Sequence, residues 1–438
     1  MSRLARLEGS ARFLALVKLA NVGLVLVWGF AVTFVFVRIL PIAEFQAFLL
    51  LVAFGNFTIS AEFGLTSIIY ARLRRHWLAQ VEKGDGGAPD DGAFRLEEMG
   101  ILFLFLGLLV AGATLILLLA LAAGWLATGL PLLFLLFFLS ACLNLPALLA
   151  KRALAAVDGN FLWEGLDCAR RVVTIALLLA MLVGLDPRVS VALQLAVSIA
   201  VIGYAIGHVH RRLGMTRGHW LAFRIGGGHV RAHYLRDIGA SAAFTVSDIV
   251  AYNAPYFTIA LATSDARPML VFDFFFKMSR ALSMLVRAMV EAALPRITRA
   301  HHAGDRARLR QLLGRALAAA MLFALGLSAV LLTVGDRLFT ILFDGRAAID
   351  QADIALIIVA LAALTLLSVS VYVQAALGRF GALLARSLPF LAGSLACAPL
   401  ALLLWPDRFD LAFLACYALT LAGVALLHLL SLRALVRA

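Results

Sequence analysis

The sequence predicts an all-α, polytopic membrane protein with twelve transmembrane helices in two sets of six. Of its 438 residues, 63% are hydrophobic and only 14% are charged, and the mean hydropathy is +0.98. Soluble domains carry about 45–50% apolar and about 25% charged residues, so both fractions point away from a soluble fold. The chain also contains uninterrupted apolar stretches of roughly 20 residues or more, which fit helices that cross a bilayer. Such stretches exclude a transmembrane β-barrel, whose strands alternate apolar and polar residues.

The spans follow from these apolar stretches and from the turn signals between them. No residue from Met99 to Ala150 is charged, which is too long for one crossing, and Thr128-Gly129-Leu130-Pro131 marks the turn of a helical hairpin. The first apolar stretch is too long for a signal peptide and lacks a cleavage site, so we expect it to stay in the membrane. The predicted spans are 13–37, 45–69, 99–125, 130–150, 162–184, 189–209, 238–262, 268–292, 312–333, 354–377, 383–404 and 410–432.

The distribution of lysine and arginine predicts the orientation of these spans. Most of the 38 basic residues fall in the terminal segments and in every second connection. Because basic residues concentrate in cytoplasmic loops, this pattern predicts that both termini are cytoplasmic. The net charge of +13 is then a sign of topology rather than of nucleic-acid binding. The outer connections hold only Arg38, Arg188, Arg267, Arg337, Arg346 and Arg408.

The longest inner connection divides the chain into two halves of six spans. It contains Gly226-Gly227-Gly228, and we expect an N-terminal lobe over 1–212, a cytosolic linker over 213–237 and a C-terminal lobe over 238–438. An even number of spans gives both lobes the same orientation. A second cytosolic loop, Gly84 to Gly92, carries paired aspartates that we interpret as solvated loop residues.

The eighth span carries five ionisable side chains at membrane depth, where each one costs at least about 2.5–3.5 kcal/mol. At about 100° per residue they share one arc of about 80°. Asp273 with Lys277, and Arg287 with Glu291, are i,i+4 pairs that can partly neutralise each other. Arg280 has no partner on its own helix. The stripe is interpreted either as the lining of a wet cavity or as a set of salt bridges that pack the bundle.

A second polar face lies on the seventh span, where the polar residues recur at helical spacing. Asp248, near mid-depth, is interpreted either as an ion-coupling or substrate-contacting group or as the structural partner of a cation such as Arg280. The members of this face are Ser241, Thr245, Asp248, Tyr252 and Tyr256.

Further polar residues lie in the N-terminal half. Lys18 and Asn21 occupy the inner part of the first span and Glu62 the inner half of the second, where functional and structural roles both remain open. A charged cluster begins the fifth span near the cytoplasmic interface, where long side chains are expected to reach out to water. No histidine or cysteine has metal-ligand spacing, so we expect no metal site. The fifth-span cluster is Glu164, Asp167, Arg170 and Arg171.

Short motifs along the chain carry a family resemblance. Arg38 to Phe45, followed by Ala61 to Leu65, and later Leu294-Pro295-Arg296-Ile297 and Gly335 to Phe343, together resemble the polysaccharide (O-antigen type) flippases. These belong to the multidrug/oligosaccharidyl-lipid/polysaccharide (MOP) exporter superfamily. The sequence departs from the family pattern by lacking a glycine before Pro41 and by having Glu62 in place of aspartate.

The resemblance implies two six-helix lobes around a central cavity that opens alternately to the two sides of a bacterial inner membrane. It implies a substrate in which an oligosaccharide is linked to undecaprenyl diphosphate, for exopolysaccharide, O-antigen or capsule assembly. A polysaccharide polymerase and export machinery are the implied partners. Arginine suits the geometry of phosphate. The substrate-binding residues would then be Lys277, Arg280, Arg287, Asp273, Lys18 and Asn21.

The resemblance also raises exchange coupled to H⁺ or Na⁺, for which Asp248 and Glu62 are the candidates. No cofactor is expected.

Other classes fit the sequence less well. A multidrug exporter of the same superfamily would favour an acidic or apolar cavity for cationic cargo, and the peptidoglycan-precursor flippase usually has two more spans. A membrane-embedded glycan-processing enzyme needs catalytic residues on a large outer loop, but the longest one here, about Thr333 to Asp353, is short. A structural scaffold would not require aligned charges. We therefore expect a transporter and not an enzyme.

Overall fold

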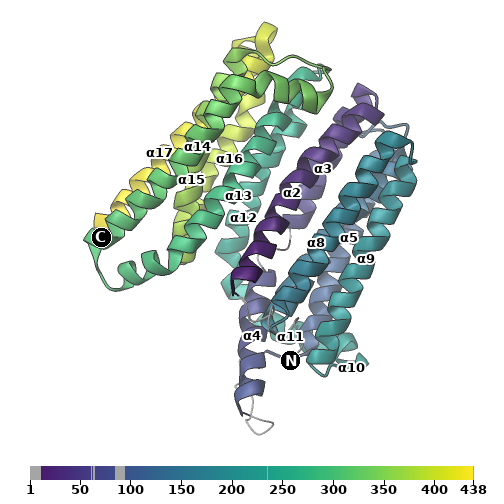
Figure 1. Ribbon diagram of the computed structural model, residues 1–438, viewed down its shortest axis with the longest axis vertical. Helices are drawn as coiled ribbons and strands as arrows, with labels where there is room; N and C mark the ends of the chain where they lie inside the picture. The colour runs from purple at the N-terminus through teal and green to yellow at the C-terminus, as the bar shows by residue number, and fades with distance from the viewer. Residues whose placement is uncertain (1–10, 61, 63–64, 84–93, 234, 438) are drawn as a thin grey trace. The chain divides into compact units, whose positions relative to one another are not determined.

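The computed structural model describes residues 11–60, 62, 65–83, 94–233 and 235–437, which form the all-helical membrane fold that the sequence predicts (Figure 1). The predicted loop over Gly84 to Gly92 lies outside the described residues. The chain divides into two compact units. Unit 1 comprises Met1–Ile39 and Phe54–Ala242, and unit 2 comprises Leu40–Ala53 and Ala243–Ala438.

The helices that lie wholly in unit 1, together with a short 3₁₀ turn, are α2 (Ala11–Ile39), α4 (Leu65–Lys83), α5 (Glu97–Ala122), α6 (Pro131–Cys142), α7 (Asn144–Ala156), α8 (Asn160–Ala180), η1 (Met181–Val183), α9 (Pro187–Arg212), α10 (Arg217–Leu221) and α11 (Phe223–His233). Two helices, α3 (Ile42–Ser60) and α12 (Leu235–Ala262), contribute residues to both units. The remaining elements of unit 2 are α13 (Arg267–His302), α14 (Arg306–Phe343), α15 (Gln351–Ala376), α16 (Phe380–Leu404), η2 (Pro406–Arg408) and α17 (Phe409–Arg437).

Each of the twelve predicted spans is mainly helical in its described residues. Within the described ranges, nine helical stretches are long and apolar enough to cross a membrane by length and composition. The three predicted spans outside that set, 162–184, 238–262 and 268–292, are helical as α8, α12 and α13. Charged and polar side chains on these three helices, such as Asp167, Asp248 and Arg280, make them less apolar than the other nine.

Two predicted spans are each built from two helices. The sequence predicts one continuous span over 45–69, but α3 ends at Ser60 and α4 begins at Leu65. The Glu62 carboxylate accepts a hydrogen bond from the Thr66 backbone N–H (3.0 Å), which satisfies one of the free donors at the start of α4.

The span 130–150 is likewise interrupted, between α6 and α7. Pro146 has no N–H to offer the preceding turn, and the Asn144 side chain donates to the Ala141 carbonyl (2.9 Å). The hairpin turn before α6 forms as predicted, with the Leu130 N–H donating to the Thr128 hydroxyl (3.0 Å).

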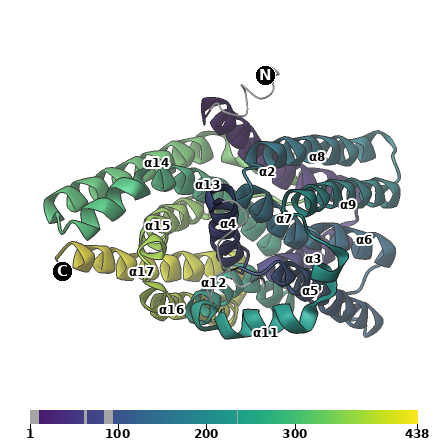
Figure 2. The same cartoon turned by 90° about the horizontal axis from the view of Figure 1, so that it is seen from below.

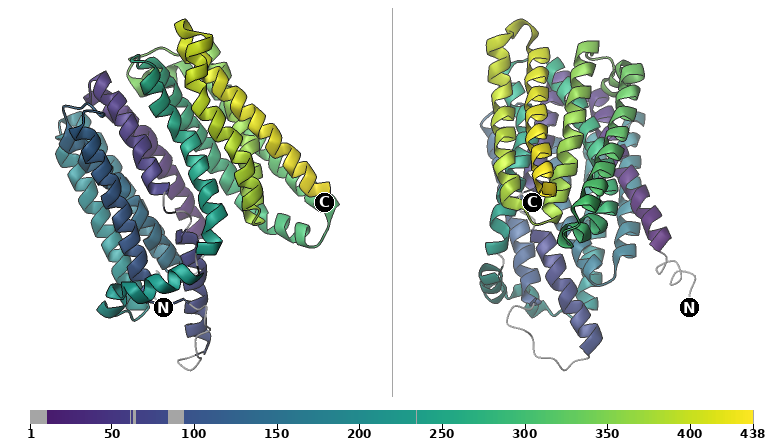
Figure 3. Two further views of the ribbon diagram at one scale, coloured as in Figure 1. Left: turned by 180° about the vertical axis from the view of Figure 1, so that it is seen from behind. Right: turned by 90° about the vertical axis from the view of Figure 1, so that its left-hand side faces the viewer.

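The glycine-rich part of the connection between the two sets of spans is helical. It lies in α11, which packs with α10 against α5 and runs across the ends of the upright helices of unit 1 (Figure 3). A Cβ atom at Gly226 would overlap the backbone of Glu97, whereas one at Gly228 would meet no atom within 4 Å. Gly226 therefore allows two helix backbones to approach closely.

Apolar packing among α4, α5, α7 and α9 forms the core of unit 1, with Leu73, Met99 and Leu149 among its buried members. The turn between α7 and α8 is tied to α4 through Asp158, which accepts from Arg74 Nη1 (2.6 Å) and Trp77 Nε1 (2.9 Å). Burial raises the pKa of Asp158, but these two hydrogen bonds and the Arg74 charge outweigh it and hold the pKa below its ordinary value.

In unit 2, α15 packs against α13, α14 and α17, and Figure 2 shows it between α14 and α17. The core is rich in aromatic residues: the Phe272 ring lies edge-on to Tyr417, with 5.4 Å between centroids. Arg267, at the start of α13, pairs with Asp353 (2.8 Å) on α15 and with Asp410 on α17. This arginine therefore ties together the starts of three helices.

Candidate functional site

The polar stripe of α13 begins with a buried network. The Asp273 carboxylate is 2% exposed and accepts a hydrogen bond from the Tyr256 hydroxyl of α12 (2.7 Å). The Lys277 ammonium, one turn along α13, forms the predicted ion pair with Asp273. The charge of Lys277 is therefore largely neutralised on its own helix.

Arg280, the next charge along the stripe, is placed differently. No carboxylate in the described part of the chain lies within salt-bridge distance of it, although its side chain is exposed. Its guanidinium carbon lies 5.3 Å from the centre of the Phe276 ring, within cation–π distance. The stripe thus presents one exposed positive charge. It has no acidic partner on its own helix, as the sequence predicts, and none elsewhere in the described part of the chain.

The far end of the stripe is a second ion pair. Arg287 Nε donates to Glu291 Oε1 (2.7 Å), and both side chains are more than half exposed. The Arg287 guanidinium also lies over the Tyr372 ring of α15, 5.9 Å from its centre. Both predicted i,i+4 pairs therefore form, and the Arg287 pair remains open to a ligand.

Asp248 lies among tyrosines rather than cations. It is partly buried on α12 and interacts electrostatically with Tyr252, Tyr372 and Tyr417. The structure does not pair it with Arg280, one of the two alternatives that the sequence left open. Tyr417 is fully buried, and its hydroxyl has no hydrogen-bond partner among the described residues. A carboxylate in these surroundings can take up a proton or attract a small cation.

The segment of α12 that carries Asp248 is anchored to α16. Pro255 has no N–H, so the Ala251 carbonyl lacks its usual donor within the helix. The Ser394 hydroxyl supplies the missing hydrogen bond (2.5 Å). The hydroxyls of Ser387 and Ser247 make a second link between the same two helices (3.2 Å).

In unit 1, the fifth-span cluster does not reach out to water as expected. Glu164, Asp167 and Arg170 are all buried. The Asn21 amide of α2 donates to Glu164 (2.8 Å) and Asp167 (2.9 Å), and Asp167 also accepts from Arg170 (2.7 Å) and Arg171 (3.0 Å). Because the charged side chains compensate one another inside the bundle, they are stable there without contacting water at the membrane interface.

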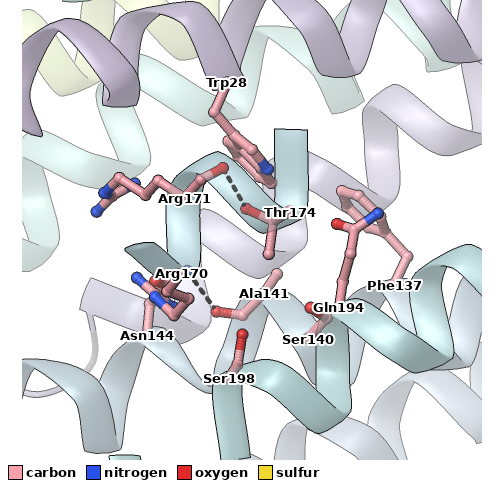
Figure 4. A pocket seen from close by; sticks show the side chains of 10 residues that line it. All are labelled: Trp28, Phe137, Ser140, Ala141, Asn144, Arg170, Arg171, Thr174, Gln194 and Ser198. Atoms are coloured by element: carbon pink, nitrogen blue, oxygen red, sulfur yellow. Dashed lines mark hydrogen bonds between the residues drawn. The ribbon is translucent and has the colours of Figure 1, made fainter. Parts of the chain in front are cut away.

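A cavity lies beside this network, between α2, α6, α7, α8 and α9 (Figure 4). Its volume is about 50 Å³, which is room for roughly three or four water molecules. Most of the residues around it are polar, and Trp28 and Phe137 are its large apolar members. The polar residues around it are Ser140, Asn144, Arg170, Arg171, Thr174, Gln194 and Ser198.

The remaining candidates of the N-terminal half have separate surroundings. Lys18 is exposed on α2, one turn before Asn21. The amide nitrogen of Asn21 is used within unit 1, as described above. Glu62 caps α4 through the Thr66 N–H.

One buried polar network was missed at the sequence level. The Gln374 side chain of α15 accepts hydrogen bonds from Arg386 (3.0 Å) and Ser431 (3.1 Å) and donates to Ser370 (2.7 Å). His428 of α17 also contacts Ser370 (3.1 Å). The signal was present in the sequence, because Ser370 and Gln374 are spaced i,i+4 within an apolar helix.

Comparison with known proteins identifies the fold. No protein-family model and no curated protein matches the chain. Among solved structures, an inward-facing multidrug resistance MATE family transporter of the MOP superfamily is similar, with a TM-score of 0.65 and 14% identity over 97% of this chain and 94% of that chain. A mutant form of the Vibrio cholerae MATE transporter VcmN has a TM-score of 0.62 and 16% identity, covering 99% of this chain and 98% of that chain.

The eukaryotic MATE transporter AtDTX14 is also similar, with a TM-score of 0.61 and 15% identity over 95% of each chain. At these identities the likeness concerns the fold. The chain therefore has an all-helical, multi-pass membrane fold like that of these MATE transporters.

Proposed function

We propose that this protein is a flippase that moves undecaprenyl-diphosphate-linked oligosaccharide units across the bacterial inner membrane by alternating access. In this proposal the two units are the two lobes, and the α13 stripe binds the diphosphate. The MOP transporter fold supports a transport function, and the sequence motifs described above favour the polysaccharide branch.

The observation that carries the proposal is the contrast along α13. Lys277 and Arg287 each have an acidic partner, whereas Arg280 between them is exposed and has none among the described residues. An arginine without a counter-charge at membrane depth is costly unless a ligand or water compensates it. A diphosphate is an anion of the right chemistry, because guanidinium groups bind phosphate oxygens through two parallel hydrogen bonds.

Asp248 is the proposed coupling group. Its carboxylate pairs with no cation in the described residues and has tyrosines around it, so binding H⁺ or Na⁺ would neutralise it at little structural cost. Glu62, whose carboxylate accepts a hydrogen bond from the Thr66 N–H at the start of α4, is the second proposed coupling candidate. Lys18, exposed on α2, remains a proposed contact for the substrate.

The proposed membrane orientation follows from the basic residues. Their concentration in alternate connections supports cytoplasmic termini in an inner membrane. A polysaccharide polymerase and export machinery are the proposed partners, because they would receive the translocated oligosaccharide.

Export of cationic drugs is the second candidate function. The observation that favours it is Asp248 with its tyrosine neighbours, since a carboxylate beside aromatic rings attracts organic cations. One structure with a similar fold is described as a multidrug resistance transporter. The stripe of basic residues on α13 disfavours such cargo.

Proteoliposomes distinguish the two functions. Purified protein is reconstituted with a polyprenyl-diphosphate-linked saccharide, and its transfer between leaflets is followed by an added glycosidase; ethidium efflux is measured in parallel. We expect saccharide transfer that Arg280→Ala abolishes and Arg280→Lys partly retains, whereas the exposed control Arg188→Gln leaves transfer unchanged. Ethidium efflux without saccharide transfer would overturn the flippase proposal in favour of drug export.

A further inference from the structure

The cavity of unit 1 differs from the α13 stripe because it is small and lies inside one bundle. Five helices contribute to its lining, and Arg170, Gln194 and Ser198 are all less than 10% exposed. The Ser198 hydroxyl makes no hydrogen bond to another described residue, and it points toward Ala141 in the middle of Figure 4. A buried hydroxyl that has no partner among the described residues and faces an open space indicates that a water molecule or a ligand occupies that space.

The network beside the cavity carries unequal numbers of positive and negative charges. Its two carboxylates are those of Glu164 and Asp167, and its cations are Lys151, Arg170 and Arg171. With every group charged, the network keeps one net positive charge. Lys151 is 3.6 Å from Glu164 and partly exposed, so the excess falls on the two arginines that share Asp167.

Both arginines also have unused donors. Arg170 donates to Asp167 through Nε and Nη2, and Arg171 donates through Nε alone. Arg170 Nη1 and both Nη atoms of Arg171 therefore donate to no acceptor among the described residues. Figure 4 shows the two guanidinium groups on the same side of the cavity, with that of Arg170 beside Asn144.

We infer that this cavity binds a small inorganic anion of the size of chloride, held by Arg170, Arg171 and the Ser198 hydroxyl. Free guanidinium N–H groups and a hydroxyl are donors, which suit an anion and repel a cation. Water alone would fill the space but would leave the excess charge in a low-dielectric bundle. A volume of about 50 Å³ accommodates a halide ion but is too small for a sugar or a lipid phosphate.

The anion would stabilise unit 1. The cavity is assembled from five helices, so it does not exist in the unfolded chain. A ligand that binds only the folded state raises stability in proportion to the logarithm of its concentration above Kd. This inference is independent of the cargo, because it concerns residues of unit 1 that the proposed transport site does not use.

The test compares anions at constant ionic strength. Full-length protein in detergent is melted in equimolar sodium chloride, sodium bromide and sodium gluconate. We expect a higher Tm in both halides than in gluconate, because gluconate is too large for the cavity. Crystals soaked in sodium bromide should show an anomalous peak beside Arg170 and Ser198.

Variants separate binding from a general effect of salt. Ser198→Val keeps the charges, removes the hydroxyl and fills part of the cavity, so it should at least halve the halide-dependent shift in Tm. Arg171→Gln should abolish the shift, and the exposed control Arg188→Gln should keep it. An equal shift in Ser198→Val and Arg188→Gln, or a bromide structure with no peak in the cavity, would overturn the assignment even if Arg171→Gln fails to fold.

Discussion

Replacing Asp167 by asparagine tests whether the charged network in unit 1 holds α2 and α8 together. The substitution keeps the shape of the side chain but removes the negative charge that receives hydrogen bonds from Asn21, Arg170 and Arg171. Arg170 and Arg171 would then lose the counter-ion that they share inside the bundle. Removing one partner of a buried ion pair costs about 3–5 kcal/mol, which corresponds to roughly two to four orders of magnitude in the unfolding equilibrium.

Glu164→Gln is the matched control. Glu164 lies one turn earlier on α8, is equally buried and binds the same Asn21 amide (2.8 Å). Among the described residues its only cation is Lys151, which is 3.6 Å away and partly exposed. A glutamine oxygen can still accept from Asn21, so the loss should be about 1 kcal/mol or less.

The two variants are compared by reversible unfolding in SDS titrations of detergent-solubilised protein, followed by tryptophan fluorescence. We expect the free energy of unfolding to be highest for the wild type, slightly lower for Glu164→Gln and much lower for Asp167→Asn. If Glu164→Gln were as destabilising as Asp167→Asn, the cost would come from loss of buried carboxylates in general. The account based on shared arginines would then be wrong.

Four further predictions concern local structure. Gly226→Ala should lower the yield of folded protein because its Cβ would overlap the α5 backbone, whereas Gly228→Ala should not; size-exclusion profiles measure both. Ser394→Ala leaves a carbonyl of α12 without a donor and should cost about 1–3 kcal/mol in SDS unfolding; no loss would show that another donor replaces it. Arg267→Gln should lower the Tm by more than the exposed control Arg188→Gln, because a buried carboxylate of α15 loses its partner. The pKa of Asp158 in the folded protein lies below its ordinary value, so its contribution to folding stability is present at neutral pH and is lost as the pH falls through the folded pKa. When the Tm is measured as a function of pH, Asp158→Asn should lose less stability over that acidic range than the wild type.

Much of the α13 stripe could be predicted from helical spacing alone. The i,i+4 pairs of Asp273 with Lys277 and of Arg287 with Glu291 form, and Arg280 has no acidic partner on its own helix. Such contacts lie within one helix, so their geometry depends only on sequence separation. The all-helical, multi-pass fold also followed from local information, namely the apolar stretches along the chain.

Contacts between helices could not be predicted from helical spacing in the same way. One of the two interpretations of Asp248 paired it with a cation such as Arg280, but the structure places tyrosines of α15 and α17 near it instead. The network that joins Asn21 to Asp167 links residues far apart in the chain. Which residues of two helices meet depends on rotation and packing of both helices, and periodicity in one of them does not contain that information.

The sequence by itself therefore determined the membrane class, the helical spans and the charges that neutralise one another along a single helix, because these depend on composition and on fixed helical geometry. Only the tertiary structure decided that the fifth-span charges are buried, that the glycine-rich connection is a helix packed on α5, and that a polar cavity lies beside Arg170. Each of these depends on which helix faces are brought together, since burial and charge compensation are properties of the assembled bundle.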